Sequence, residues 1–154
     1  MKGDKPTVKL LNKCLKNELT STNQFFLHAR MYKNWGLGAL NEKSYNASIK
    51  AMKQADKLIG RVLFLDGLPN LQDLGKLRIG EDPKEMIDAD LTLITGIRTQ
   101  LVEGIAHCES ASDYVSRELL ENILKYTEEY LDWLETQRVL MKDVGIQNYL
   151  QKMM

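Results

Sequence analysis

The chain has 154 residues, a size that fits one domain with its own hydrophobic core. Its 21 basic and 21 acidic residues balance, which argues against nucleic acid as a partner. No segment reaches the roughly 18 apolar residues of a membrane span, and the two cysteines form no CxxC motif. We therefore expect a single cytoplasmic domain over 1–154, with reduced cysteines and no membrane or nucleic-acid partner.

Long segments repeat apolar residues at alternating spacings of three and four, the pattern of helices that share one core. An N-cap aspartate followed by proline, Asp82–Pro83, marks one helix start. The predicted helices cover, in chain order, Thr7–Asn34, Glu42–Asp66, a third from Asp82 to the break at Ser110–Asp113, a fourth from there to Gly145, and a short fifth over Ile146–Met153.

The connections between these helices indicate the topology. Short turns join the first two helices and the last two, so each pair should form an antiparallel hairpin. Between the pairs lies Gly67–Glu81, which contains Pro69 and lacks helical periodicity. A connection this long is uncommon in a compact domain unless it runs along the bundle. The sequence therefore predicts an all-α four-helix bundle with one long crossover and a short C-terminal fifth helix.

A second apolar stripe lies on the first two helices, rotated away from the predicted core. Tyr45, Ile49 and Met52 form it on one helix, and Leu19 and Phe26 match it on the other. A monomeric bundle needs one buried stripe per helix, so the extra stripe favours a two-fold dimer surface. A wide core stripe is the alternative. A lone methionine on such a stripe more often fills a core than binds a ligand.

Several segments carry a specific resemblance to one family. The run Gly67–Gly75 (Gly-Leu-Pro-Asn-Leu-Gln-Asp-Leu-Gly) lies in the crossover, where a generic helical bundle has no reason to share it. Segments Gln24–Tyr32, Ala55–Ile59, Leu131–Gln137 and Asn148–Leu150 agree as well. On these segments the chain resembles the bacterioferritins, which have the ferritin-like fold, over nearly its whole length. The resemblance implies a hollow 24-meric cage that stores ferric mineral.

The resemblance also implies haem b on the two-fold axes, with one methionine ligand from each of two subunits. Met52 stands at the family's axial position, on the second apolar stripe. A thioether is a soft ligand that suits haem iron, and a two-fold interface supplies two copies of it. The residues that the resemblance indicates for the pocket wall are Leu19, Asn23, Phe26, Trp35, Tyr45 and Ile49.

The family's ferroxidase centre is a di-iron site in the bundle core. Two helices each give a Glu and two others each give Glu-x-x-His. Of these six positions only Glu18 keeps a ligand-type side chain. The other five positions hold Ala51, Gln54, Ile94, Thr127 and Tyr130. Active members of the family also have a tyrosine near the site, and this chain has Phe25 at that position. Iron needs carboxylate and imidazole donors at one point, so we expect no intact di-iron site and no catalytic residue.

In place of the metal centre we expect a metal-free polar plug around Glu18. Tyr130 is the expected hydrogen-bond donor to its carboxylate, with Gln54 and Thr127 as further partners. A weak single-metal site at Glu18 is the alternative. The lone His28 and His107 are expected in structural or surface roles.

These observations predict a haem-bearing subunit without ferroxidase activity in an iron-storage cage. Such a subunit would assemble with a catalytic bacterioferritin subunit and pass electrons for the release of stored iron. The resemblance implies a small ferredoxin as the electron donor. Two alternatives remain: an active ferroxidase homopolymer with an unusual metal site, and a haem-binding structural helical dimer. The first needs ligands that the sequence lacks, and retention of the crossover and the C-terminal helix argues against the second.

Overall fold

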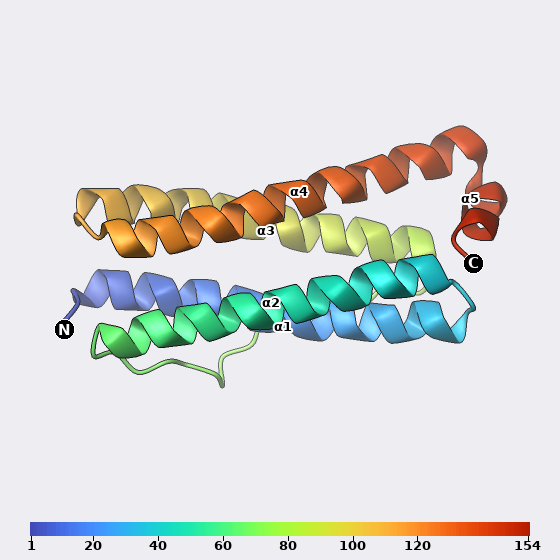
Figure 1. Ribbon diagram of the computed structural model, residues 1–154. Helices are drawn as coiled ribbons and strands as arrows, with labels where there is room; N and C mark the ends of the chain where they lie inside the picture. Colours follow the sequence, from blue (N-terminus) through green and yellow to red (C-terminus); the bar gives the residue numbers. More distant parts are fainter.

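The computed structural model describes all residues, 1–154, and contains helices but no strands. Four long helices run side by side as an elongated bundle, and a short one lies across its end (Figure 1). The helices are α1 (Lys5–Asn34), α2 (Gly38–Phe64), α3 (Pro83–Ser110), α4 (Tyr114–Val144) and α5 (Ile146–Lys152). This confirms the predicted four-helix bundle with its short C-terminal helix.

Capping residues fix several of the helix ends. The Asp82 carboxylate accepts a hydrogen bond from the Glu85 N–H at 2.9 Å, and that of Asp113 accepts one from the Ser116 N–H at 3.0 Å. These bonds satisfy N–H groups that lack partners in the first turns of α3 and α4. Gly145 has a φ of 82°, which favours glycine, and it separates α4 from α5.

The turn between α1 and α2 is shorter than the sequence pattern predicted, because α2 begins at Gly38 and not at Glu42. Leu40 in this first turn is fully buried, and its packing outweighs the weak helix propensity of Gly38. Gly36 takes a left-handed φ of 76° just after α1, the usual geometry of a helix C-terminus.

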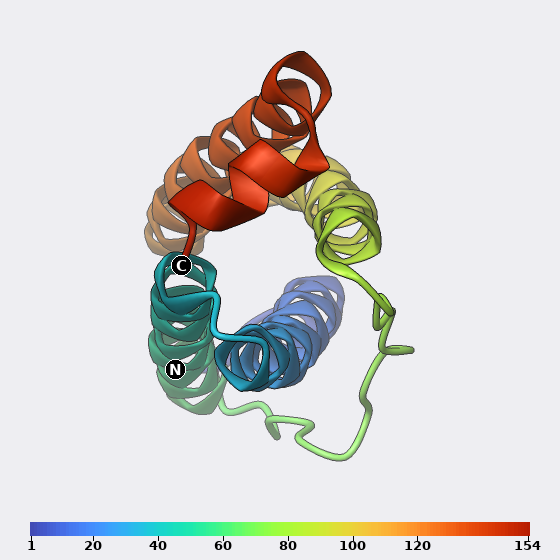
Figure 2. The ribbon, with the colours of Figure 1, turned by 90° about the vertical axis from the view of Figure 1, so that its right-hand side faces the viewer.

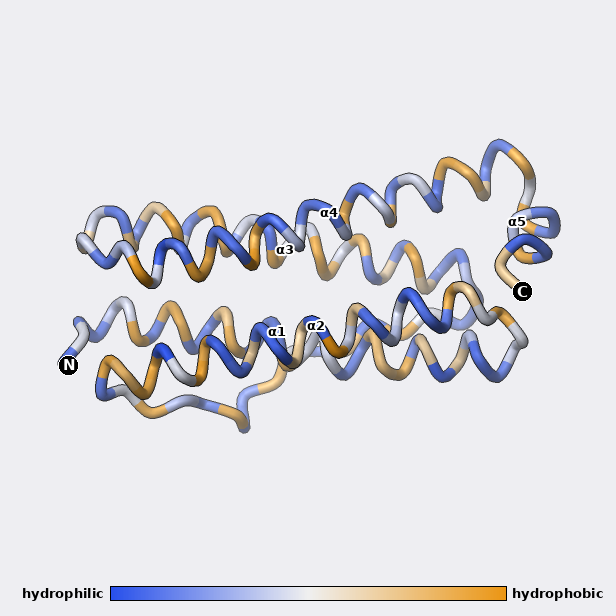
Figure 3. Tube along the Cα trace, viewed as in Figure 1, coloured by the Kyte–Doolittle hydropathy of each residue, from blue (hydrophilic) through white to orange (hydrophobic).

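Apolar side chains from all four long helices fill the centre of the bundle. The hydrophobic positions recur along each helix, as the hydropathy colours in Figure 3 show. Leucines from every long helix are fully or almost fully buried, among them Leu11, Leu15, Leu58, Leu101, Leu120 and Leu134. None of the five helices combines the length and apolar character needed to cross a lipid bilayer.

The crossover between α2 and α3 passes around the outside of α1 (Figure 2). Polar side chains spaced four residues apart on α1 hold it along its length, and we call these contacts the crossover ladder. In chain order they join Asn12 to Leu68 and Asn70, Lys16 to Asp73, Thr20 to Gly75, Gln24 to Arg78, and His28 to Gly80. The ladder satisfies backbone groups that have no helix or sheet partner.

A buried pair fastens the end of the ladder to α3. His28 Nδ1 lies 3.0 Å from Asp90 Oδ1, which also accepts a hydrogen bond from Gln24 Nε2 at 2.8 Å. His28 Nε2 accepts the N–H of Gly80, so Nδ1, the nitrogen that faces Asp90, is the one that carries a proton. Burial raises the pKa of the Asp90 carboxyl, and the contacts with His28 and Gln24 oppose that rise. His107 is held by Thr7, with Oγ1 and Nε2 3.0 Å apart, so both histidines have the structural roles predicted for them.

Asp90→Ala should lower the free energy of unfolding by about 2 kcal/mol, because it leaves buried polar groups of His28 and Gln24 without a partner. Urea denaturation of the two proteins measures the difference. Glu103→Ala, an exposed change on the same helix, is the control and should stay within about 0.5 kcal/mol of the unaltered chain. Equal losses in the two variants would show that the Asp90 contacts do not stabilise the fold.

Candidate functional site

The positions of the expected metal centre meet in the middle of the bundle, around a small cavity of about 10 Å³. That volume holds about one water molecule. Every long helix contributes to the wall, which consists of Glu18, Ser21, Phe25, Ala47, Ala51, Gln54, Ile94, Ile97, Tyr126 and Thr127. The structure therefore brings together six of the seven positions named from the sequence, and leaves Tyr130 outside the wall.

Glu18 is the single carboxyl of this cavity, and its side chain is buried, with 4% exposed. It forms none of the predicted hydrogen bonds to Gln54, Thr127 or Tyr130. The Thr127 hydroxyl donates instead to the carbonyl of Ile123 at 2.8 Å. Burial raises the pKa of Glu18 to about 8, so the carboxyl is protonated at neutral pH. The predicted hydrogen-bonded plug is thus corrected to a buried, neutral acid.

Tyr126 of α4 lines one side of the cavity, and two further aromatic side chains of α4 pack beside it. The ring centroid of Tyr130 lies 6.1 Å from that of Tyr126 and 5.6 Å from that of Trp133. Tyr130 also contacts Phe25 of α1, with centroids 5.2 Å apart. We call Tyr126, Tyr130 and Trp133 the aromatic stack. Burial raises the pKa of Tyr126 to about 12, and the nearby Glu18 carboxyl adds to that rise.

Two lysines of α2 cover the aromatic stack. Lys43 Nζ lies 5.1 Å from the ring centroid of Trp133 and 5.9 Å from that of Tyr130. Lys50 Nζ lies 5.5 Å from the ring of Tyr126. Ammonium groups at these distances are attracted to the ring faces. Cations and aromatic rings therefore stand beside a cavity where a di-iron site would need anionic donors. No group of three or more His, Cys, Asp or Glu side chains is arranged to hold a metal ion.

A second candidate site is the apolar face of the α1–α2 hairpin. Met52 is half exposed (50%), and Phe26 is 46% exposed. The rings of Phe26 and Tyr45 are 6.3 Å apart, which sets the register of the two antiparallel helices. By that register Leu19 lies level with Met52. The structure thus gathers on one face five of the residues named for the haem pocket besides Met52, namely Leu19, Asn23, Phe26, Tyr45 and Ile49.

Trp35 does not join this group. It follows the end of α1 and lines a separate surface cavity of about 430 Å³ with Leu37 and Leu150. Met52 lies 14 residues into α2 from Gly38, which corresponds to roughly 21 Å along the helix axis. Trp35, which lies just before Gly38 in the chain, is therefore far from Met52 along the axis of α2.

Arg30 is a residue of this face that sequence reasoning missed. Its guanidinium lies 5.1 Å from the ring centroid of Phe26 and 4.9 Å from that of Tyr45, which places it against both rings. The spacing of four residues from Phe26 on an exposed helix face is the signal that indicates such a contact. Arg30 adds a positive charge beside the two aromatic rings of this face.

Comparison with known proteins places the chain in a family. A family model described as a ferritin-like domain matches residues 8–144, so the bundle belongs to the ferritin-like class. The bacterioferritin of Mycobacterium leprae is 42% identical over 149 residues, which cover 97% of this chain and 94% of that protein. Bacterioferritin BfrA of Mycobacterium tuberculosis has the same identity and coverage. The bacterioferritin of Brucella melitensis is 40% identical over 151 residues, which cover 98% and 94% of the two chains. The chain belongs to the bacterioferritins.

Proposed function

We propose that this chain is a haem-bearing bacterioferritin subunit that lacks ferroxidase activity and works within an iron-storage cage. The contrast between its two candidate sites carries the proposal. The central cavity keeps one carboxyl, Glu18, whereas Met52 stays on an exposed apolar face. General decay of function would not spare one site and empty the other.

The central cavity does not fit a di-iron site. Iron in such a centre needs several carboxylate and imidazole donors at one point. Ala51 and Ile94 supply none, and Glu18 is the single carboxyl of the wall. The remaining volume of about 10 Å³ admits about one water molecule beside these side chains. We therefore assign no step of iron oxidation to this chain.

The α1–α2 face fits a shared haem. Met52 offers a thioether, a soft donor that suits haem iron, and a second copy across a two-fold axis would supply the other ligand. Leu19, Phe26 and Ile49 would form apolar walls around the group. Burial of the exposed Phe26 and Met52 side chains would favour both haem binding and pairing of the subunits. Haem, when bound, supplies one-electron transfer.

This division of sites assigns a role within a mixed cage. A second bacterioferritin subunit with all di-iron ligands would oxidise ferrous iron, and the present chain would contribute shell and haem. Met52 and its copy across the two-fold axis would hold the haem, which would supply one-electron chemistry for the reduction and release of stored ferric iron, and we expect a small ferredoxin as the electron donor.

Met52→Leu should reduce the haem content of the purified protein at least about tenfold, because each haem loses both thioether ligands. The Soret absorbance per chain, recorded after expression with excess haem, measures the content. Met154→Leu changes an exposed methionine at the other end of the fold and should keep full haem. Equal haem in the Met52 variant and the unaltered chain would remove Met52 from the haem site.

Oxidation of ferrous iron tests the other half of the proposal. The chain alone should oxidise ferrous iron no faster than buffer, and addition of a subunit with a complete ligand set should restore rapid oxidation. Light scattering on the same samples should show a cage and not a dimer. Rapid oxidation by the purified chain alone would contradict the proposal.

A further inference from the structure

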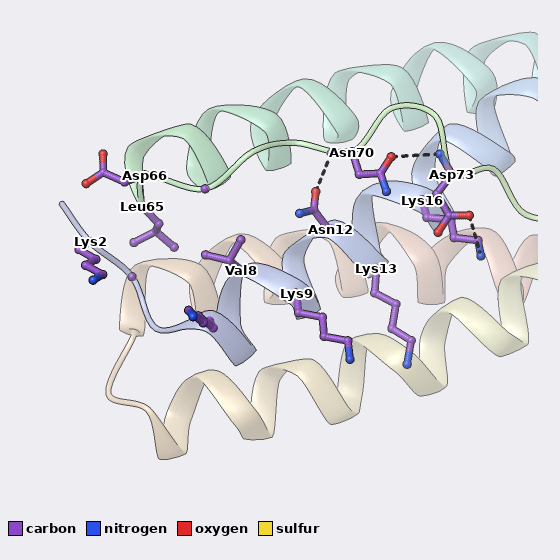
Figure 4. Close-up of a pocket in the computed structure, with 13 residues that line it drawn as sticks. Lys2, Val8, Lys9, Asn12, Lys13, Lys16, Leu65, Asp66, Asn70 and Asp73 are labelled. Atoms are coloured by element: carbon purple, nitrogen blue, oxygen red, sulfur yellow. Dashed lines mark hydrogen bonds and ion pairs between the residues drawn. The ribbon is translucent and has the colours of Figure 1, made fainter.

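An open groove of about 650 Å³ lies where α1 begins, beside the start of the crossover. Five lysines line it, and Figure 4 shows Lys9 and Lys13 extending from the same face of α1. The five are Lys2, Lys5, Lys9, Lys13 and Lys16. The whole chain has no net charge, so this concentration of one sign is a local feature.

Most of this positive charge has no partner. Asp73 pairs with Lys16 at 3.3 Å, and Asp66 pairs with the N-terminal amine at 3.4 Å. These two are the only acids of the groove wall. The other four lysines lie in no ion pair, so the groove keeps a surplus of positive charge.

The lysines also oppose the stability of α1. Lys5 is the first residue of the helix, at the positive end of its dipole, and the first turn contains no acid. Lys5, Lys9 and Lys13 follow at spacings of four, where like charges repel one another along a helix. Conflicts with two stability rules on one helix face are expected where that face has a functional role.

The floor of the groove is rigid. Asn12 Nδ2 donates to the carbonyl of Leu68 at 3.1 Å, and Asn12 Oδ1 accepts the N–H of Asn70 at 2.9 Å. These bonds hold the crossover against α1 and use the amide groups of the floor. The free lysines therefore provide the binding groups, at intervals of about 6 Å along α1.

We propose that the groove binds a linear inorganic polyphosphate chain. A row of compact ammonium charges matches a polymer of repeated phosphate charges better than a single anion. The wall contains no aromatic side chain on which nucleic-acid bases would stack. It also contains no Trp, Tyr or Arg, the residues that anchor protein interfaces. Recognition by charge alone is what remains, and a polyphosphate chain needs nothing more.

The test is the binding of fluorescently labelled polyphosphate to the full assembled protein, followed by anisotropy as salt is raised. The unaltered protein should bind at about 50 mM salt and lose affinity steeply as salt increases. A variant with Lys5→Gln, Lys9→Gln and Lys13→Gln should bind at least about tenfold more weakly. Its plot of log affinity against log salt should be shallower by about 2, the effect of three lost phosphate contacts.

Matched variants make the result decisive. Lys125→Gln, Lys142→Gln and Lys152→Gln remove the same charge from exposed sites on α4 and α5 and should leave binding unchanged. Replacing Lys5, Lys9 and Lys13 by Arg keeps the charge and should keep binding. An equal loss in the α4–α5 variant, or a loss in the Arg variant, would overturn the proposal. So would single-stranded DNA of equal charge that binds as tightly as polyphosphate, or orthophosphate that competes at the same phosphate concentration.

Discussion

Restoring the family's ligand pattern should give this chain rapid ferroxidase activity, at least about a hundredfold above that of the unaltered chain. The restored variant carries Ala51→Glu, Gln54→His, Ile94→Glu, Thr127→Glu and Tyr130→His. With Glu18 these residues recreate the two Glu and two Glu-x-x-His sets of a di-iron bundle. Four of the five altered positions already line one cavity, so the backbone is in place to bring the ligands together. Stopped-flow oxidation of ferrous iron measures the gain.

Metal binding by the restored variant should also raise its melting temperature. Buried carboxylates repel one another without metal, so the restored variant should melt below the unaltered chain when empty and rise when ferrous or zinc ions are added. A control with Ala51→Gln, Ile94→Gln and Thr127→Gln has side chains of similar size without the charge and should bind no metal. The restored variant could fold and bind two ions yet oxidise iron no faster than the unaltered chain. That result would refute the idea that the missing ligands alone explain the lack of ferroxidase activity.

Glu18→Gln should stabilise the protein by about 3 kcal/mol at pH 7. The pKa of Glu18 is raised from 4.5 to about 8 by burial. Between those two values the unfolded chain has released the proton while the folded chain still holds it, so stability falls as pH rises, by about 1.4 kcal/mol per pH unit. Glutamine is similar in size and uncharged, so the variant loses this dependence. Below about pH 4.5 the carboxyl is protonated in both states, and the two proteins should be nearly equal in stability.

Urea unfolding at several pH values from about 5 to about 8 gives the curve for each protein. Glu129→Gln, an exposed change on α4, is the matched control and should stay parallel to the unaltered chain. A loss of stability in Glu18→Gln at pH 7 would mean that the folded state holds an ionised, partnered carboxylate. In that case a cation bound to the Glu18 carboxylate would explain the cavity better than a neutral acid does.

The helices could be predicted from the sequence because their signals are local. Apolar spacing marks each buried stripe, and Asp82–Pro83 marks the start of α3 without any tertiary information. The start of α2 could not be predicted in this way, because the burial of Leu40 outweighs the weak helix propensity of Gly38. The crossover ladder was equally invisible, because polar residues on α1 gain meaning only when the crossover lies beside them.

The candidate site was predicted in position but not in detail. Tyr126 was missed because it lies about 100° around α4 from Thr127, yet its long side chain still reaches the cavity. The predicted hydrogen bond from Thr127 to Glu18 was wrong because the Thr127 hydroxyl donates to the carbonyl of Ile123 in its own helix. Such competition between local and distant partners is decided by distances that a sequence does not contain.

The spacing of the crossover ladder determines which way the crossover travels. Contacts four residues apart on a helix of 3.6 residues per turn advance about 40° each, so the five anchors from Asn12 to His28 turn about 160° around α1. This arc takes the chain from the α2 side of α1 to the α3 side (Figure 2). The same anchors at spacings of three would rotate in the opposite sense, by about 60° per step. The four-residue interval of the polar anchors on α1 therefore matches the path that the crossover takes around that helix.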